Sequence, residues 1–222
     1  ETVDQRTLVG GKENVVISDA MTLSIPVQIG EAPTPEKSHL IFGDIFFNGE
    51  TNGRMMHPDQ YFMIVNNGEK TEYLDGVCYA VAAHGNPMPE SPWTNYLADK
   101  GELPVAGIYQ FPGSGKEYPI KPGEFKIVAA TAINHHTEDK PNSVDLSGAD
   151  FEFLFPDVEL PTGDGKTIKI TDTDNPDVPN MNIIVDCFSS TGIAHPRGFW
   201  PPLLFKVEGD LSAFLKDHVM QV

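Results

Sequence analysis

The sequence has few basic residues. It contains 15 Lys and Arg against 32 Asp and Glu, which gives a formal charge of −17 over 222 residues. A protein that binds nucleic acid needs clustered positive charge to neutralise the phosphate backbone, so we expect no nucleic-acid partner. The same deficit disfavours binding to an anionic membrane surface. No apolar stretch of about 18 residues occurs, so we also expect no transmembrane segment.

Cysteine is scarce as well, because Cys78 and Cys187 are the only two in the chain. Both lie in apolar, strand-like runs, and free cysteine is among the most often buried residue types. A disulfide between them would close a loop of roughly 100 residues and stabilise the fold by about 4–5 kcal/mol. We favour two buried, unpaired thiols, and two cysteines do not identify the redox compartment.

The start of the sequence lacks a methionine and a basic-then-apolar targeting segment, since it begins at Glu1. We interpret the chain as mature or trimmed, with room for a removed signal or a lipid-bearing cysteine. Asn-x-Ser/Thr sequons are absent too, so eukaryotic glycosylation has no support.

What the sequence does contain is a series of short apolar runs with alternating character, separated by turn residues that include many of its 19 prolines. Such runs indicate β-strands, and proline is excluded from central strands. We therefore predict an all-β, immunoglobulin-like antiparallel β-sandwich with one short C-terminal helix. The strands are predicted over residues 14–29, 39–47, 60–65, 72–83, 103–111, 125–133, 151–155, 166–171, 181–188 and 203–207.

Several details sharpen this prediction. Gly43 interrupts an apolar strand and is expected to form a β-bulge. Asp210 is a plausible N-cap for a helix over 210–218. Residues 1–37 read as an N-terminal segment with a first strand, either an edge strand or the remnant of a preceding module, and residues 38–222 read as the sandwich domain.

Four stretches carry a resemblance to known proteins. They are DQYFMIVNNGEKTEYLDGV from residue 59, FPGSGKEYPIKPGEFKIVAATAINH from residue 111, NSVDLSGADFEF from residue 142 and DNPDVPNM from residue 174. The first is similar to lamin-tail domains, and all four together resemble a family of uncharacterised secreted proteins from gut Bacteroidetes. The resemblance covers roughly residues 41–205. It implies a lamin-tail-like sandwich, export, and attachment to the cell surface by a lipid, but it implies no catalytic residue.

Two stretches invite a ligand. Gly113 to Lys116 reads GSGK, but the first glycine of a phosphate-binding loop is missing and Glu117 stands where Ser or Thr must bind Mg²⁺, so we predict a turn. The second stretch, residues 172–180, is rich in side-chain oxygens, and hard cations such as Ca²⁺ prefer oxygen ligands. Asx turns explain the same residues, and we favour them over calcium. The candidate ligands are Asp172, Asp174, Asn175 and Asp177.

His135 and His136, with Glu138 and Asp139, have the residue types of a transition-metal site. Neighbouring side chains on an extended segment point to opposite faces, so we favour an exposed polar loop. Asp150 and Glu152 lie two apart on a predicted strand and are the candidates for a carboxylate-dependent hydrolase.

Aromatic side chains in long loops are the remaining candidates, since such residues are frequent in binding surfaces. For Trp200 we favour packing on the core, whereas for Trp93 packing and binding both stay open. We thus predict a non-catalytic binding or structural module, and the resemblance implies that it is exported to the periplasm or outer surface of a Gram-negative bacterium. It would recognise glycan or a surface protein through Trp93, Tyr96 and His135. A calcium-stabilised adhesin-like domain is the alternative.

Overall fold

A computed structural model of the protein describes residues 8–10, 29–31, 39–47, 49, 58–83, 85, 93–187, 193–194 and 198–218. The chain divides into two units, Glu1–Lys37 and Ser38–Val222. The first unit contains an antiparallel pair, β1 (Leu8–Gly10) and β2 (Ile29–Glu31). Most of the strand predicted over residues 14–29 lies outside the described residues.

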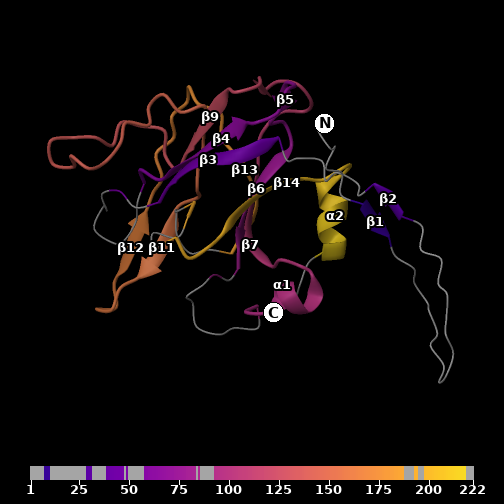
Figure 1. Ribbon diagram of the computed structural model, residues 1–222. Helices are drawn as coiled ribbons and strands as arrows, with labels where there is room; N and C mark the ends of the chain where they lie inside the picture. Colours follow the sequence, from indigo (N-terminus) through magenta and orange to yellow (C-terminus); the bar gives the residue numbers. More distant parts are fainter. Residues whose placement is uncertain are drawn as a thin grey trace. The chain divides into compact units, whose positions relative to one another are not determined.

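The second unit is built on two four-stranded sheets (Figure 1). Sheet I has the order β10-β9-β4-β3, and sheet II has the order β13-β7-β6-β14. The strands of sheet I are β3 (Leu40–Phe46), β4 (Tyr61–Asn66), β9 (Phe125–Ala129) and β10 (Phe151–Glu152). The strands of sheet II are β6 (Val77–Ala82), β7 (Val105–Gln110), β13 (Asn182–Asp186) and β14 (Pro202–Lys206).

Two short ribbons and two helices complete the described part of this unit. The ribbons are β5 (Glu72–Tyr73) with β8 (Pro119–Ile120), and β11 (Val158–Pro161) with β12 (Thr167–Ile170). The helices are α1 (Tyr96–Lys100) and α2 (Leu211–His218). The predicted all-β sandwich with a short C-terminal helix is therefore confirmed.

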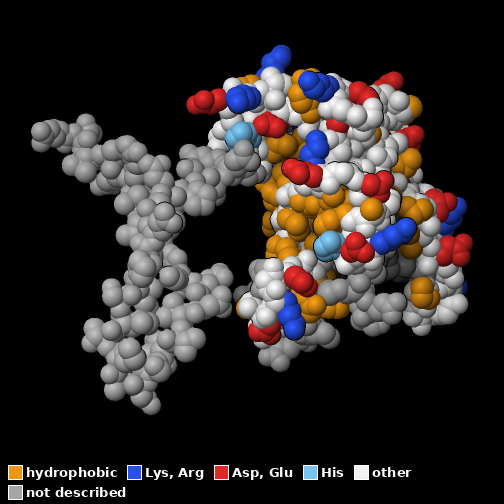
Figure 2. Space-filling model, turned by 90° about the vertical axis from the view of Figure 1, so that its right-hand side faces the viewer, with side chains coloured by type: hydrophobic (Ala, Val, Ile, Leu, Met, Phe, Trp, Pro, Cys, Tyr) orange, Lys and Arg blue, Asp and Glu red, His pale blue; other side chains and the backbone are white. Residues whose placement is uncertain are grey.

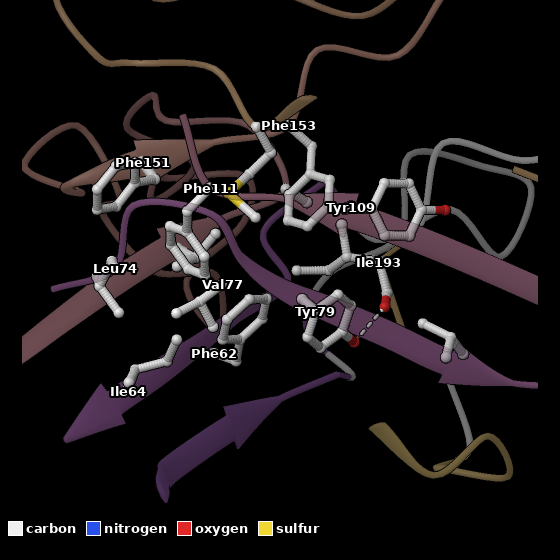
Figure 3. Packing of buried hydrophobic residues seen from close by; sticks show 14 of the residues in the cluster. Phe62, Ile64, Leu74, Val77, Tyr79, Tyr109, Phe111, Phe151, Phe153 and Ile193 are labelled. Carbon is white, nitrogen blue, oxygen red and sulfur yellow. Dashed lines mark hydrogen bonds between the residues drawn. The ribbon is translucent and has the colours of Figure 1, made fainter. Parts of the chain in front are cut away.

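Alternation along the strands builds the core. In β4 the side chains of Phe62 and Ile64 are buried between the sheets, while those of Tyr61, Met63 and Val65 face outward and are half-buried. The period-2 pattern of a strand makes this sorting automatic. Aromatic rings fill much of the space between the sheets (Figure 3). The buried aromatic residues of this core are Phe62, Tyr79, Tyr109, Phe111, Phe151, Phe153 and Phe155.

The centre of the core is the ring pair of Phe62 from sheet I and Tyr79 from sheet II, stacked with centroids 4.3 Å apart. The Tyr79 hydroxyl donates a hydrogen bond to the carbonyl oxygen of Ile193 at 2.7 Å, drawn as the dashed line in Figure 3. A buried hydroxyl needs such a partner, since leaving it unpaired costs about 1–3 kcal/mol. This bond fixes Ile193, which lies between β13 and β14 in the sequence, against the sandwich.

The outer face of sheet II is partly covered by α2, whose Leu211 and Leu215 pack over Cys78, Ala80 and Ile108. Asp210 caps the helix as predicted, accepting a hydrogen bond from the Ala213 amide at 2.7 Å. Figure 2 shows the side of the molecule that carries α2 in Figure 1, with hydrophobic side chains gathered among charged ones.

The predicted bulge at Gly43 is confirmed, because the register between β3 and β4 shifts between Phe42 and Asp44. The strand predicted over residues 151–155 is shorter, and β10 pairs with β9 in parallel. Parallel neighbours need a crossover, which explains the long segment between them. Strand β11 was not predicted, and α1 forms within a stretch that the sequence assigned to a loop.

Both cysteines are unpaired, as predicted, but only Cys78 is buried. Burial raises the pKa of the Cys78 thiol to about 11, which keeps it protonated and unreactive at neutral pH. Cys187 follows the last residue of β13 and is exposed, so the expectation of two buried thiols is wrong for this one. The apolar residues before Cys187 do not bury it, because β13 ends at Asp186.

Candidate functional site

Trp93 and Tyr96 form an aromatic pair at the start of α1. Their rings meet edge to face, with centroids 5.7 Å apart and planes at 66°, and both side chains are half-buried. The turn that presents them is held by the Tyr96 amide, which donates to the Trp93 carbonyl at 3.2 Å. The pair therefore offers partly exposed aromatic surface on a short, hydrogen-bonded segment. Residues 86–92 of the same loop lie outside the described part of the chain.

The structure does not bring His135 to this pair. Figure 1 draws α1 at the foot of sheet II and the segment between β9 and β10 on the opposite, upper side. The His135 side chain is only 9% exposed, and its Nε2 lies 2.9 Å from the carbonyl oxygen of Thr131. Its backbone amide donates to the carbonyl of Val144. His135 thus holds its own loop together and offers little surface to a ligand.

His136 is exposed but also bonds within the loop, with Nδ1 3.1 Å from the Ser143 carbonyl oxygen. The loop is a small hairpin in which Asn134 bridges Asp145 and Thr137 bridges Lys140. Across the described residues, no group of three or more His, Cys, Asp or Glu is arranged to hold a metal ion. His84 and His195 lie outside the described residues.

The oxygen-rich stretch 172–180 uses its side chains on its own backbone and on neighbouring loops. Asp172 accepts hydrogen bonds from the Thr131 hydroxyl at 3.0 Å and the Phe155 amide at 2.9 Å. Asp174 accepts from the side-chain amide of Asn180 at 3.0 Å. These bonds tie the stretch to other segments and are not Asx turns, but they do give the carboxylates of Asp172 and Asp174 protein partners.

Asn175 and Asp177 complete that arrangement. The Asn175 side chain donates to the Ala132 carbonyl at 2.8 Å and accepts from the Asp177 amide at 3.2 Å. Asn175 therefore ties the loop to the end of sheet I. Asp177 itself is exposed and contributes its backbone amide to this turn.

Glu152 is the most deeply buried carboxylate of this region, with a relative exposure of 0%. One carboxylate oxygen accepts from the Ala132 amide at 2.7 Å, and the other accepts from the Asn175 amide at 2.6 Å. Burial raises its pKa, the two amides lower it, and the charges of Asp174 and Asp172 raise it further, for a net increase. Glu152 thus joins two loops at an electrostatic cost.

Asp150, its partner in the hydrolase interpretation, has a different environment. It forms an ion pair with Lys126 at 2.7 Å and accepts from the Ile127 amide at 2.9 Å. Both carboxylates therefore anchor backbone, Asp150 to β9 and Glu152 to the loops beyond it. Residues two apart on a strand share a face, but the two carboxylates differ in burial. Glu152 is fully buried, whereas the Asp150 side chain is 30% exposed.

The Gly113–Lys116 segment does cradle an anion, and that anion is the carboxylate of Asp75. The amides of Gly115, Glu117 and Tyr118 donate to it at 3.1, 2.9 and 3.0 Å. Gly113 has φ +100°, and a Cβ there would overlap Asp75 Oδ1. The predicted turn thus has a glycine that both its conformation and the nearby carboxylate require.

Burial opposes ionisation of Asp75, but the amides of Glu117, Tyr118 and Gly115 outweigh it and hold the pKa below the usual range. Sequence analysis missed this partnership, since Asp75 lies forty residues before Gly115 in the loop that surrounds it. Trp200 behaves as expected, because it packs against the main core.

The outer face of sheet I is a surface that sequence analysis missed. Its outward side chains form rows across β3, β4 and β9, and the register aligns Ile41 with Val65 and Val65 with Phe125. At the other end of the strands, Tyr61 and Ile127 are covered by Leu146 and Val178 from the crossing loops. The row of Ile41, Val65 and Phe125, with Gly43 and Met63 beside it, is called the open face below.

The open face is apolar and exposed. Phe125 is 53% exposed and Ile41 is 39% exposed, so two of the large hydrophobic side chains that remain accessible lie in one row. Strand alternation could have placed these residues on one side, but the cross-strand register that aligns them is a tertiary property.

Comparisons with known proteins now bear on this fold. Residues 121–221 match the family model "Protein of unknown function (DUF4876)". No curated protein sequence is significantly similar to the chain. Among the described residues, no helix is long and apolar enough to cross a membrane.

A solved structure is also similar, the crystal structure of a DUF4876 family protein from Bacteroides thetaiotaomicron. It superposes with a TM-score of 0.53 at 23% sequence identity, over 91% of this chain and 50% of the other. The chain thus spans about half the length of that protein. At this identity the likeness extends to the fold alone, so the comparisons show a β-rich chain whose second half is similar to a family of unknown function.

Proposed function

We propose that this protein is a non-catalytic binding module, exported to the periplasm or outer surface of a Gram-negative bacterium, that recognises a glycan through Trp93 and Tyr96. The observation that carries the proposal is the partly exposed aromatic pair at the start of α1. Aromatic rings offer apolar faces on which the C–H faces of sugars stack, and Tyr adds a hydroxyl. Binding residues are often carried by loops that a rigid scaffold holds in place.

The non-catalytic part is supported by how the carboxylates are used. Asp75, Asp150 and Glu152 each accept backbone hydrogen bonds that hold elements of the fold. A general acid or base must reach a substrate proton, which a side chain occupied in this way does poorly. The location rests on the resemblance to secreted Bacteroidetes proteins, and the acidic composition agrees with it.

A glycan array tests the proposal, using the wild-type protein, Trp93→Ala and Tyr96→Ala. Phe214→Ala is the matched control, because Phe214 is also a partly exposed aromatic residue but lies on α2. We expect each loop variant to weaken binding to the recognised glycan by about tenfold or more, while the control binds like the wild type. Unchanged binding by both loop variants, or no binding by the wild type, would remove this surface from consideration.

A further inference from the structure

The angle between the rings of Trp93 and Tyr96 restricts what this pair can hold. Their planes cross at 66° with the centroids 5.7 Å apart, so the edge of one ring takes up part of the other ring's face. A flat polysaccharide chain stacks on rings that lie in one plane, because each stacked sugar needs a ring face of its own. The crossed rings instead form the two walls of a corner, called the aromatic corner below, which has room for one sugar ring.

Backbone contacts hold the segment that carries the aromatic corner. At the start of α1 the Asp99 amide donates to the Asn95 carbonyl at 2.9 Å. Gly101 follows α1 with φ +70°, a left-handed conformation that ends the helix and that glycine adopts without strain. The Pro104 carbonyl then accepts from the Ala83 amide at 2.9 Å, which ties the end of the segment to the residue after β6. An ordered segment keeps the angle between the rings, so the ligand must fit that angle.

Polar side chains accompany Tyr96. Asp99 and Lys100 follow it by three and four residues, and this spacing places them on the same side of α1. Asn95 precedes it directly, and the side chains of all three polar residues are exposed. A carboxylate accepts hydrogen bonds from sugar hydroxyls, whereas amide and ammonium groups donate to them. The aromatic corner therefore has hydrogen-bonding groups beside it that suit a sugar with free hydroxyls.

The charges beside the aromatic corner disfavour an acidic sugar. Residues 93–104 contain two acidic residues, Asp99 and Glu102, and one basic residue, Lys100, which stands between them in the sequence. The whole chain carries a charge of −17. This excess of negative charge repels a uronic acid or a sulfated sugar, and the Arg and Lys groups that bind carboxylate and sulfate are scarce in this segment. The site is therefore suited to an uncharged sugar.

We propose, as a consequence of the glycan binding proposed above and dependent on it, that the aromatic corner holds one neutral sugar residue at an end or a branch of a glycan. The sugar stacks its C–H face on one ring, and the other ring closes the side of the corner. Asn95 and Asp99 exchange hydrogen bonds with its hydroxyls. The next sugars of the glycan leave the corner, so they contribute little affinity. A neutral glycan with accessible chain ends fits this description, whereas flat or acidic polysaccharides do not.

Chain length tests the single-sugar part of the proposal. The soluble probes are neutral gluco-, manno- and galacto-oligosaccharides from disaccharide to hexasaccharide, titrated calorimetrically into the wild-type protein, and microcrystalline cellulose is the flat probe. The affinity for the best-bound series is expected to change by less than about threefold with length, because one sugar makes the contacts. A rise of about tenfold or more with length would overturn the single-sugar site. Retention on cellulose that Trp93→Ala abolishes would overturn it as well.

Capping the same oligosaccharides with glucuronic acid tests the neutral-sugar part. At low salt the wild-type protein is expected to bind the neutral chain at least about threefold more tightly than the capped one. Asp99→Lys reverses a charge beside the corner and is expected to remove this preference. Asp139→Lys makes the same change on the segment between β9 and β10, drawn on the opposite side in Figure 1, and is expected to keep it. Equal wild-type affinity for both chains, or equal shifts in the two variants, would overturn the neutral-sugar assignment.

Melting curves check that the variants are folded. Asp99→Asn removes the charge alone and is expected to reduce the preference by about half, so it repeats the test if Asp99→Lys is unstable. The outcomes also separate this proposal from the one on which it depends. A protein that binds glycan through Trp93 but prefers long or acidic chains would overturn the neutral single-sugar site alone. A protein that binds none of these probes and nothing on the glycan array would overturn both proposals.

Discussion

The carboxylate of Asp75 provides the sharpest test of how the loops are held. Asp75→Ala leaves the amides of Gly115, Glu117 and Tyr118 without their shared acceptor. Hydrogen bonds to a charged group contribute about 1.5–3 kcal/mol each, so three would give at most about 9 kcal/mol. Residues 113–117 are exposed, and water replaces part of the lost bonding. We therefore expect a loss of about 2–4 kcal/mol in the free energy of unfolding.

Chemical denaturation at pH 7 measures this loss. Asp157→Ala is the control, because Asp157 forms only an exposed ion pair with Lys169, and such pairs contribute about 0–1 kcal/mol. Adding formate is expected to raise the melting temperature of Asp75→Ala more than that of the wild type, because a small carboxylate can occupy the emptied cradle. An Asp75→Ala protein as stable as Asp157→Ala would refute the assignment of the cradle.

The pH dependence has a definite sign. The pKa of Asp75 is lowered in the folded protein, so its contribution is present above the pKa of an unfolded Asp, about 3.9. It is lost as pH falls through the folded-state pKa. The stability difference between wild type and Asp75→Ala is therefore expected to be constant from about pH 5 to 8 and to shrink in stronger acid.

Two further predictions concern the buried carboxylates and the aromatic core. Glu152 and Asp172 have raised pKa values in the folded protein, so their stabilising contribution is present below about pH 4 and is lost as pH rises through their folded-state values. The melting temperature of the wild type should fall over that rise, and Glu152→Gln should flatten the fall; an identical slope in the variant would contradict the assignment. Phe62→Ala removes the ring stacked on Tyr79 and is expected to cost about 3–5 kcal/mol in denaturant unfolding, against less than about 1 kcal/mol for the exposed Phe214→Ala.

Local patterns predicted much of the fold. Alternating apolar residues located the strands of both sheets, Gly43 marked the bulge, and Asp210 marked the start of α2. These features depend on residues close in sequence. Strand β11 escaped prediction because it is short and ends at Pro161, and proline argues against a strand.

The remaining features depend on contacts between distant residues. The apolar run 151–155 is a strand by composition, but Asp172 takes the Phe155 amide and so ends the pairing early. Asp75 fell within the strand predicted over residues 72–83, and its role was not visible because its partners lie in another loop. The 172–180 stretch showed its oxygens in the sequence, but only the structure shows which of them already have partners. The open face likewise appears only once the register of β3, β4 and β9 is known.

The central claim of this account is that the acidic side chains of the sandwich hold its loops and are not there to bind a cation. Thermal melting of the protein with EDTA and with excess calcium tests it most directly, because a ligand of the folded state must raise the melting temperature. The account predicts the same melting temperature in both conditions, since Asp172, Asp174 and Asn175 already have protein partners. A rise of several degrees with calcium that disappears in Asp174→Ala would contradict it.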